Sequence, residues 1–463
     1  MKRVLIISYY WPPAGGSGVQ RWVKFAKYLP AEGWQPVIYT PENPELSSVD
    51  ETLMVDIPAE AEIIRRPITE PYSLYRRLMG SKASTDMQTL IGKRSGAAGE
   101  SKAKADDEAA RATGGEVNPI SGGSKDWKQN LSLWIRGNLF IPDPRVWWVG
   151  PSVRFLKKYL KEHPVDVIVT TAPPQSMHLI GQRLHKATGI PWVADFRDPW
   201  TKLFYYKHLH LSAASDRKHH KLEKAVLDDA SAVISVTPLV QREFQEMTRT
   251  PVVLITNGFD EDDYPAFTTS GSGKDSSAPE FRITHTGLFA EDGNPLTLWD
   301  ALAEKCATDE GFKSALRIRL VGKVDEAIIS AIEARGLGGC LDNLGYRPHN
   351  EAVAEQRAAS LLILPLRQEP EYRNVLPGKI FEYLAARRPV LGIGQEDGAA
   401  AQVLADTRAG VMCDWDNAAA IRSAVDRAWS AHLAAEPFNS ASIDCYTRRH
   451  LTHLLATLLD QLK

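Results

Sequence analysis

Residues 4–40 read VLIISYYWPPAGGSGVQRWVKFAKYLPAEGWQPVIYT and carry the pattern that decides the fold. The apolar run at 4–8 predicts a parallel strand that is buried on both faces. A loop rich in proline and glycine follows, and residues 19–29 then repeat apolar side chains at roughly helical spacing. Residues 35–40 open a second strand. A strand, a crossover helix and a strand at this spacing predict a doubly wound α/β sheet.

The same pattern recurs along the chain in two series. Further strands of the first series are expected at 165–170, 191–196, 232–236 and 252–255. The second series starts at Phe281, with strands expected at 282–285, 317–321, 361–364 and 389–393. The stretch 267–280 between them is polar and carries several serines and glycines, which is typical of a flexible connection. Two successive series predict two facing Rossmann-like domains with a cleft between them.

The domain boundaries follow from these series. We expect an N-terminal domain over residues 1–257, a C-terminal domain over 258–440, and a terminal helix over 441–463 that packs back toward the N-terminal domain. An insertion at about 80–130 interrupts the first domain. Between residues 95 and 125 its only large apolar side chains are Val117 and Ile120. Such a composition buries too little apolar surface to offset the entropy of ordering, so we expect the insertion to be disordered.

The composition is that of an ordinary globular protein. Hydrophobic residues make up 43% of the 463 residues, charged residues make up 24%, and the formal net charge is −2. No strong field therefore favours a nucleic-acid partner. The four cysteines show no zinc-ligand spacing and indicate a reducing compartment. No stretch approaches the ~18–20 apolar residues of a membrane span. We therefore expect a cytoplasmic protein without a metal site.

Aromatic and basic residues gather just after the insertion. They include Trp134, Arg136, Trp147 and Trp148. One interpretation is a loop whose aromatic ends pack against the domain. The other is a peripheral contact with the inner membrane or with a lipid-linked acceptor, because tryptophan and arginine suit the membrane interface.

The first candidate site is the loop directly after the first strand, which contains Gly15, Gly16, Ser17 and Gly18. Glycines let a ligand approach the backbone, and the start of the following helix offers N–H groups to an anion. The spacing fits neither the dinucleotide fingerprint nor the P-loop. The alternative is a tight strand-to-helix turn without a ligand. Because this loop lies at the ligand edge of an open α/β sheet, we favour a binding loop.

The second candidate site is the segment ADFRDPW at 194–200, which places Asp195, Arg197 and Asp198 at the end of a buried strand. Charged groups at such a place are costly unless they are paired or used in chemistry. We predict a catalytic role for these three residues. The alternative is a structural pair between arginine and aspartate that ties the loop.

Two histidines follow strands. His178 lies within a helical pattern, where a lone histidine is more often structural, and we retain it as a candidate beside the glycine loop. His285 ends the first strand of the second series, in the sequence ITHTG. We expect it to point toward the cleft, with Gly287 letting a phosphate approach the backbone.

The third candidate site is EYRNVLPGKIFEYLAARRPVL at 371–391. We expect a helix over residues 379–386, whose start lies at the carboxyl edge of the second sheet. Glu382 lies in its first turns, where it can accept two ribose hydroxyl groups. Arg373, Asn374 and Lys379 surround it with donors suited to a diphosphate or to sugar hydroxyls. We favour a nucleotide-sugar site over the alternative, a solvated helix start without a ligand.

Together these motifs resemble the retaining GT-B glycosyltransferases of family 4, in particular bacterial transferases of capsule, exopolysaccharide and lipopolysaccharide assembly. The resemblance rests on PGKIFEYLAARRPV at 377–390, DFRDPW at 195–200 and TNGFD at 256–260. It implies transfer from a nucleotide diphosphate-sugar to a glycan or lipid-linked acceptor, with retention, without a metal and without a bound cofactor. It also implies that the donor binds mainly to the C-terminal domain and the acceptor to the N-terminal one.

The sequence departs from the family pattern at the donor site. Of the family's two glutamates, spaced Glu-x7-Glu, the second is Glu382, expected on the ribose, and the first falls at Asn374. The family's arginine and lysine after the glycine of the donor loop are absent from residues 287–294. Neutralisation of the diphosphate is then expected from Lys379, Arg373 or Arg367.

The acceptor side is assigned by the same resemblance. Asp195 or Asp198 is expected to orient the acceptor, with Arg197 near the phosphate. Two other classes of protein remain open. A nucleotide-sugar 2-epimerase has the same architecture and needs no acceptor, and a non-catalytic relative would bind the nucleotide sugar without transferring it.

Overall fold

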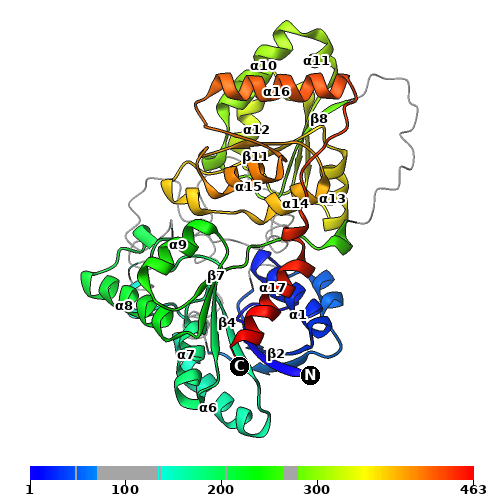
Figure 1. The fold of residues 1–463 in the computed structure, drawn as a ribbon. Coiled ribbons are helices and arrows are strands. Elements are labelled where there is room, and N and C mark those ends of the chain that lie inside the picture. The colour runs from blue at the N-terminus through cyan, green and yellow to red at the C-terminus, as the bar shows by residue number, and fades with distance from the viewer. Residues whose placement is uncertain (47–48, 70–133, 135–136, 204–205, 265–279, 463) are drawn as a thin grey trace, which may run out of the picture. The chain divides into compact units, whose positions relative to one another are not determined.

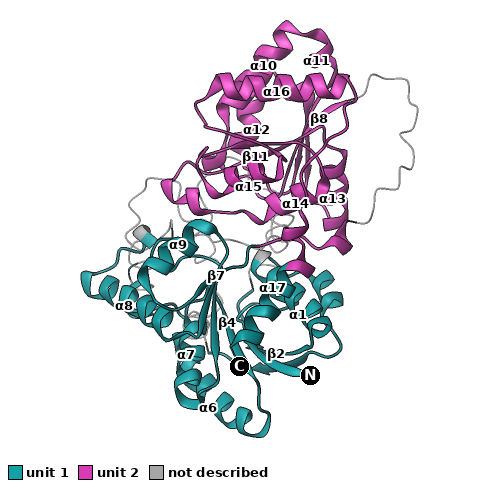
Figure 2. Ribbon diagram, in the orientation of Figure 1, with its two compact units in different colours: residues 1–256, 451–463 teal, residues 257–450 magenta. Residues whose placement is uncertain are grey.

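A computed structural model describes residues 1–46, 49–69, 134, 137–203, 206–264 and 280–462 (Figure 1). The predicted insertion at about 80–130 and nearly all of the predicted connection at 267–280 lie outside these residues. The chain forms two compact units. Unit 1 comprises Met1–Thr256 and Leu451–Lys463, and unit 2 comprises Asn257–His450 (Figure 2).

Unit 1 is built on a seven-stranded parallel sheet with the strand order β3-β2-β1-β4-β5-β6-β7. Its strands are β1 (Lys2–Ile7), β2 (Trp34–Pro41), β3 (Glu62–Arg66), β4 (Val167–Ala172), β5 (Trp192–Phe196), β6 (Ala232–Ser235) and β7 (Val252–Leu254). Its helices include α1 (Ser17–Tyr28), α6 (Val146–Glu162), α7 (Ser176–Thr188), α8 (Ala213–Asp229) and α9 (Pro238–Met247). The strand order reverses between β1 and β4, which creates a topological switch point at their carboxyl ends.

The core of unit 1 lies on both faces of this sheet. Because successive side chains of a strand point to opposite faces, Leu5 and Ile7 pack into one apolar cluster and Val4 and Ile6 into another. The first cluster includes side chains of α6 and α7, and the second includes those of α1. Helix α17 (Arg448–Gln461) closes the second cluster (Figure 1).

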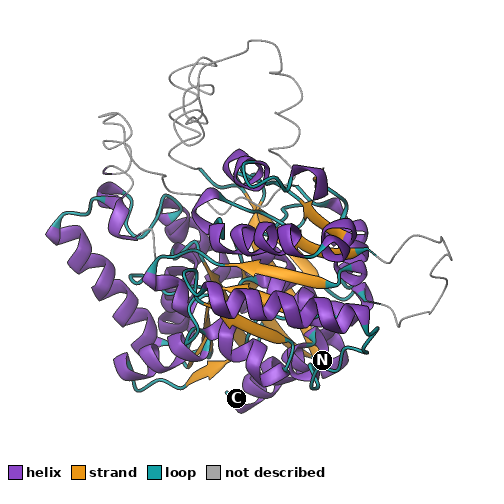
Figure 3. Cartoon of the chain, turned by 90° about the horizontal axis from the view of Figure 1, so that it is seen from above, coloured by secondary structure: helices purple, strands orange, loops and turns teal. Residues whose placement is uncertain are grey.

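Unit 2 repeats the design with a six-stranded parallel sheet in the order β10-β9-β8-β11-β12-β13. Its strands are β8 (Phe281–Thr286), β9 (Leu316–Val321), β10 (Leu341–Gly345), β11 (Leu361–Pro365), β12 (Val390–Ile393) and β13 (Gly410–Cys413). Its helices are α10 (Leu296–Thr308), α11 (Glu310–Ala315), α12 (Glu326–Glu333), α13 (His349–Ala358), α14 (Gly378–Ala386), α15 (Ala399–Thr407) and α16 (Ala418–Leu433). Strands and helices alternate along the chain, and Figure 3 shows the strands among the helices that cover them.

The predicted α/β class with two Rossmann-like doubly wound sheets is confirmed by these topologies. Strands β3, β10 and β13, at or near the sheet edges, were not predicted. In the described part of the chain, no helix combines the length and the apolar character that crossing a membrane requires.

Candidate active site

The candidate site of unit 1 lies at the carboxyl ends of β1, β4 and β5, around the switch point. Asp195, on β5, is fully buried, and both its oxygens are hydrogen-bonded. Oδ1 accepts from Nη2 of Arg21 at 2.9 Å, and Oδ2 accepts from Nε1 of Trp22 at 2.7 Å and from Oγ1 of Thr171 at 2.8 Å. The carboxylate therefore ties α1 to β4 and β5.

The electrostatics of this cluster agree with an anchoring role. Burial alone would raise the pKa of Asp195, but the charge of Arg21 and the hydrogen bonds from Arg21, Trp22 and Thr171 outweigh it and hold the pKa below its ordinary value. Arg21 is also fully buried, and its guanidinium donates to the carbonyl oxygens of Ile255 at 2.9 Å and Thr256 at 2.7 Å. The prediction that Asp195 contacts a substrate does not fit this geometry, because its carboxylate has no exposed surface.

Sequence reasoning missed Arg21. One signal was available: Arg21 is a charged residue directly beside Trp22, on the apolar side of α1. Apolar residues on that side, such as Phe25, are fully buried. A buried arginine requires a carboxylate partner, so Arg21 and Asp195 could have been paired on that ground.

Arg197 has a different environment. Its side chain is half-buried, and its guanidinium donates to the carbonyl oxygens of Ala172, at 3.2 Å from Nε, and of Pro173. The same guanidinium lies against Gly18, where any side chain would collide with it. Burial lowers the pKa of Arg197, and the neighbouring charge of Asp198 opposes that shift. The structure thus brings together Gly18 of the first candidate site and Arg197 of the second.

The glycine loop leads directly into α1. Gly16 occupies the N-cap position with φ of 109°, a conformation that favours glycine, and its carbonyl oxygen accepts from the backbone of Val19 at 3.0 Å. Gly15 precedes it, and Ser17 is the first residue of the helix. Because glycine has no side chain with which to cap a helix, this helix start is suited to an anionic ligand.

His178 lies in the core rather than at the glycine loop. It is fully buried on α7, its ring packs on Phe196 at 4.4 Å between centroids, and its Nδ1 lies 2.8 Å from Oγ1 of Thr170. Burial lowers its pKa to about 3. Nε1 of Trp192 donates to the same Thr170 oxygen at 2.9 Å, so this hydroxyl joins His178 to Trp192 within the core. The prediction that His178 lines the binding loop is not supported.

The candidate site of unit 2 lies at the carboxyl ends of β8 and β11, which are neighbours in the sheet. Lys379, in the first turn of α14, places its Nζ 3.0 Å from Nε2 of His285 and 3.1 Å from the carbonyl oxygen of Leu288. Burial, together with the charge of Lys379, lowers the pKa of His285 well below its ordinary value. The neutral imidazole therefore accepts a hydrogen bond from the ammonium group and helps to fix its position.

Gly287 completes this corner of the site. Its φ of 95° is in the left-handed region, and a Cβ on it would lie 3.5 Å from Nζ of Lys379. The carbonyl oxygen of Gly287 lies close to Gly322, in the space that a side chain on Gly322 would occupy. Only a glycine at position 322 therefore allows the backbone at Gly287 to come this close. The ammonium group of Lys379 is thus held beside the bare backbone of Gly287.

Glu382 lies one turn further along α14 and is half-buried. Its Oε2 accepts from Nε2 of Gln356 on α13 at 3.0 Å. Gln356 also donates to Oγ1 of Thr286, at the end of β8, at 3.0 Å. Gln356 was not singled out from the sequence, because nothing in the local sequence of α13 distinguishes it from other polar helix residues.

Three further residues were predicted to bind the donor: Arg367, Arg373 and Asn374. The two arginines form ion pairs, and Asn374 lies just before α14. Arg367 pairs with Asp292 at 3.0 Å, and both belong to loops at this sheet edge. Arg373 is exposed and pairs with Asp397 at 2.7 Å. Asn374 ends the short 3₁₀ turn Pro370–Asn374 that precedes α14. Of the three predicted cations, Lys379 lies beside His285 at the end of β8 and beside Gly287.

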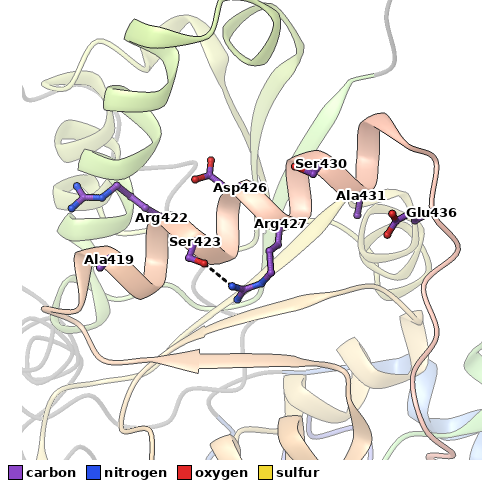
Figure 4. Close-up of a pocket in the computed structure, with 8 residues that line it drawn as sticks. All are labelled: Ala419, Arg422, Ser423, Asp426, Arg427, Ser430, Ala431 and Glu436. Atoms are coloured by element: carbon purple, nitrogen blue, oxygen red, sulfur yellow. Dashed lines mark hydrogen bonds between the residues drawn. The ribbon is translucent and has the colours of Figure 1, made fainter.

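A shallow hollow beside α16 is separate from this site (Figure 4). Its lining residues come almost entirely from α16, and none belongs to the predicted donor site. Two of its charged side chains form ion pairs with α10: Arg422 lies 2.7 Å from Glu304, and Asp426 lies 2.7 Å from Lys305. Within the described residues, no group of three or more histidine, cysteine, aspartate or glutamate side chains could hold a metal ion.

Two family models match the sequence, one to each unit. The model described as Glycosyltransferase Family 4 matches residues 110–263, and the model described as Glycosyl transferases group 1 matches residues 280–431. Together they span about two thirds of the chain. No curated protein matches the sequence.

Solved structures share the fold at low sequence identity. Sucrose-phosphate synthase from Thermosynechococcus elongatus superposes with a TM-score of 0.56 at 15% identity, covering 100% of this chain and 95% of that one. WaaG, a glycosyltransferase involved in lipopolysaccharide biosynthesis, gives 0.51 at 15% identity over 98% and 99% of the two chains. S. aureus TarM, in a complex that contains UDP, gives 0.53 at 10% identity over 99% and 100%.

These matches agree with the arrangement of two parallel, doubly wound sheets. The chain belongs to the family 4-like glycosyltransferases of the GT-B fold.

Proposed function

We propose that this glycosyltransferase moves a sugar from a nucleotide diphosphate-sugar to a glycan or lipid-linked acceptor, with retention of the anomeric configuration, in the synthesis of a cell-surface polysaccharide. The observation that carries the proposal is the position of Lys379 in the first turn of α14, 3.0 Å from His285 and beside the backbone of Gly287. A cation and a helix start that share one sheet edge form a site for a diphosphate.

The main task of the donor site is to stabilise the charge that grows on the departing diphosphate. Lys379 supplies a positive charge, and the N–H groups at the start of α14 supply aligned dipoles. His285 keeps the ammonium group in place without competing for the phosphate, because a neutral imidazole adds no negative charge. Glu382 accepts hydrogen bonds from the ribose, as its position on the same helix suggests.

The acceptor side is proposed for the glycine loop, Arg197 and Asp198. The bond between the anomeric carbon and the diphosphate oxygen breaks through an oxocarbenium-like transition state. The acceptor oxygen forms its bond on the same face of the sugar, and its proton passes to the departing phosphate oxygen. Asp198 orients the acceptor hydroxyl, and Asp195 acts through Arg21 and Trp22 as a positioning residue.

The proposal is tested by a ligand screen followed by product analysis. Thermal shifts with UDP-, GDP- and ADP-sugars identify the donor, because a ligand at 100 times its dissociation constant adds about 2.7 kcal/mol to stability. Incubation with lipid-linked and glycan acceptors, read by the anomeric coupling constant in proton NMR, then gives the stereochemistry. We expect a product that keeps the configuration of the donor, and an inverted product would contradict the mechanism.

The same experiment separates the other two classes of function. Conversion of the nucleotide sugar to its C2 epimer without an acceptor would identify an epimerase. Binding without transfer and without slow donor hydrolysis would identify a non-catalytic relative. The family match to glycosyltransferases over both units favours transfer over either.

We also propose that unit 1 contacts the cytoplasmic face of the inner membrane. Trp134, Leu139 and Trp147 are large apolar side chains with exposed fractions of 43%, 63% and 48%. Trp148 belongs instead to the core, where it stacks on Tyr39, and Arg136 lies outside the described residues. Flotation with vesicles of phosphatidylethanolamine and phosphatidylglycerol tests this contact. The double variant Trp134→Ser, Trp147→Ser is expected to float less than the wild type, and equal flotation would contradict the contact.

A further inference from the structure

Gln356 is the buried polar centre of a network next to Glu382. It lies on α13, which packs against both β8 and α14, and only 1% of its surface is exposed. Its Nε2 donates to Oε2 of Glu382 and to Oγ1 of Thr286, each at 3.0 Å, and its Oε1 accepts from the hydroxyl of Tyr264 at 3.2 Å. Both protons of the amide nitrogen are therefore used, and its oxygen has a donor.

This network fixes the orientation of the amide. Tyr264 keeps its proton, because burial and the nearby charge of Glu382 raise its pKa. It therefore donates to Gln356 and requires the amide oxygen on its side. Rotation of the amide by half a turn would place Oε1 against the carboxylate of Glu382, where two acceptors repel each other. The Gln356 amide is thereby locked with its NH2 group toward Glu382.

The fixed amide of Gln356 in turn restricts the carboxylate of Glu382. Glu382 is half-buried, and Gln356 holds its Oε2. Its other oxygen, Oε1, has no hydrogen-bond partner among the described residues. A carboxylate with one oxygen held and the other available presents a fixed acceptor to a ligand, and the loss of that constraint costs binding through added side-chain freedom.

We propose that Gln356 is the positioning residue of the ribose site, and that it aims Glu382 at the ribose hydroxyls of the nucleotide. The inference rests on the proposed function, because it takes Glu382 as the carboxylate that binds ribose. It adds a residue that does not touch the ligand, and a second one, Tyr264, which sets the orientation of the first.

The test compares nucleotides with and without the 2′-hydroxyl, since a merely structural residue would weaken both equally. Calorimetry on the full chain measures the dissociation constants of UDP, GDP and ADP and of their 2′-deoxy forms. For the diphosphate that binds tightest, we expect the wild type to prefer the ribose form about tenfold, the scale of a hydrogen bond to a charged group. In Gln356→Leu we expect the preference to fall to about threefold or less.

A matched control is Gln402→Leu. Gln402 is an exposed glutamine of α15 in the same unit, and its Nε2 also donates to a carboxylate, that of Asp406 at 2.7 Å. The control is expected to keep the wild-type preference. If the Gln356→Leu variant fails to fold, Gln356→Glu is measured in its place. It preserves the shape and the contact with Tyr264 but places a second acceptor against Glu382, so it is also expected to lose the preference.

Each outcome decides one of the claims. A preference retained in both Gln356 variants overturns the positioning role and leaves the proposed function intact. A wild type that binds a diphosphate without preference for ribose overturns this inference alone. A wild type that binds none of the diphosphates overturns the proposed function and this inference with it.

Discussion

The guanidinium group of Arg197 occupies the place where a side chain on Gly18 would begin. Because the same group donates to the carbonyl oxygens of Ala172 and Pro173, one side chain joins the first turn of α1 to the end of β4. Gly18 is not among the residues with a positive φ, so glycine is required there for space and not for its backbone conformation. The contact explains why a glycine lies at this position in the first turn of α1.

Gly18→Ala is therefore expected to displace Arg197 and to slow transfer. A misplacement of about 1 Å at a reacting centre costs up to ~100-fold in rate, so we expect at least a tenfold loss in kcat/KM for the acceptor. Binding of the nucleotide diphosphate in unit 2 should change less than twofold, since Lys379 and Glu382 are untouched. Gly150→Ala is the control, because a Cβ on Gly150 in α6 meets nothing within 4 Å. Wild-type turnover in Gly18→Ala would contradict a role for Arg197.

The two aspartates of the ADFRDPW segment are expected to behave differently. Asp195→Asn removes the charge that pairs with the fully buried Arg21, and breaking a buried pair costs about 3–5 kcal/mol. Asp198 is half-buried, and Asp198→Asn should change stability by less than about 1 kcal/mol while it lowers transfer. Urea denaturation and an acceptor assay on both variants separate the roles. A stable Asp195→Asn protein with impaired transfer would return Asp195 to direct catalysis.

Lys379→Ala is expected to weaken binding of the nucleotide diphosphate by about 10- to 100-fold, because it removes a charged hydrogen-bond donor from the phosphates. Arg373→Ala provides the comparison within the same segment. Arg373 is exposed and pairs with Asp397, so its loss should change the dissociation constant by less than about threefold. Calorimetry with the diphosphate measures both. Equal effects of the two substitutions, or unchanged affinity in Lys379→Ala, would remove Lys379 from the phosphate site.

The buried His178 predicts a dependence of stability on pH. Its pKa is about 3 in the folded chain against an ordinary value of 6.5. Between these values the unfolded chain binds a proton that the folded chain does not, so the free energy of unfolding falls as the pH is lowered from 6.5 toward 3. The slope is about 1.4 kcal/mol per pH unit, so about 2 kcal/mol is lost between pH 6.5 and pH 5.

The matched variant for this effect is His178→Gln, whose amide can still hydrogen-bond to Thr170 and does not titrate. Urea denaturation at several pH values should give it a shallower acid slope than the wild type. His285 contributes with the same sign and is present in both proteins, so it cancels in the comparison. Identical slopes in the two proteins would show that His178 is already charged when folded.

The sequence predicted the parts of the fold that depend on local pattern. The apolar runs of β1, β4 and β11 are recognisable because central parallel strands are buried on both faces. The strands β3 and β10, at the sheet edges, mix polar and apolar residues and carry no such signal. The segment around Lys379 and Glu382 was found because its proline, glycine and helix pattern lie together in sequence.

What could not be predicted depends on partners that are distant in sequence. The sequence pattern around Asp195 gives no sign of a partner, because Arg21, with which it pairs, lies 174 residues earlier in the chain. His178 appeared available for the same reason, since Thr170 and Phe196 enclose it only after folding. Gln356 acquires its role from Thr286 and Glu382, which the fold brings to it from a strand and another helix.

The position of α17 has a consequence for how the chain folds as it is synthesised. Leu451, Leu455 and Leu459 belong to the apolar cluster that also holds Val4 and Ile6, so unit 1 lacks part of its core until residues 451–463 have been made. Unit 2, Asn257–His450, is complete before that point. The usual order, in which the N-terminal domain folds first on the ribosome, is therefore reversed for the final closure of this protein. The apolar side chains that α17 covers in the finished unit, such as Val4 and Ile6 of the same cluster, therefore wait for the last part of the chain before their core is complete.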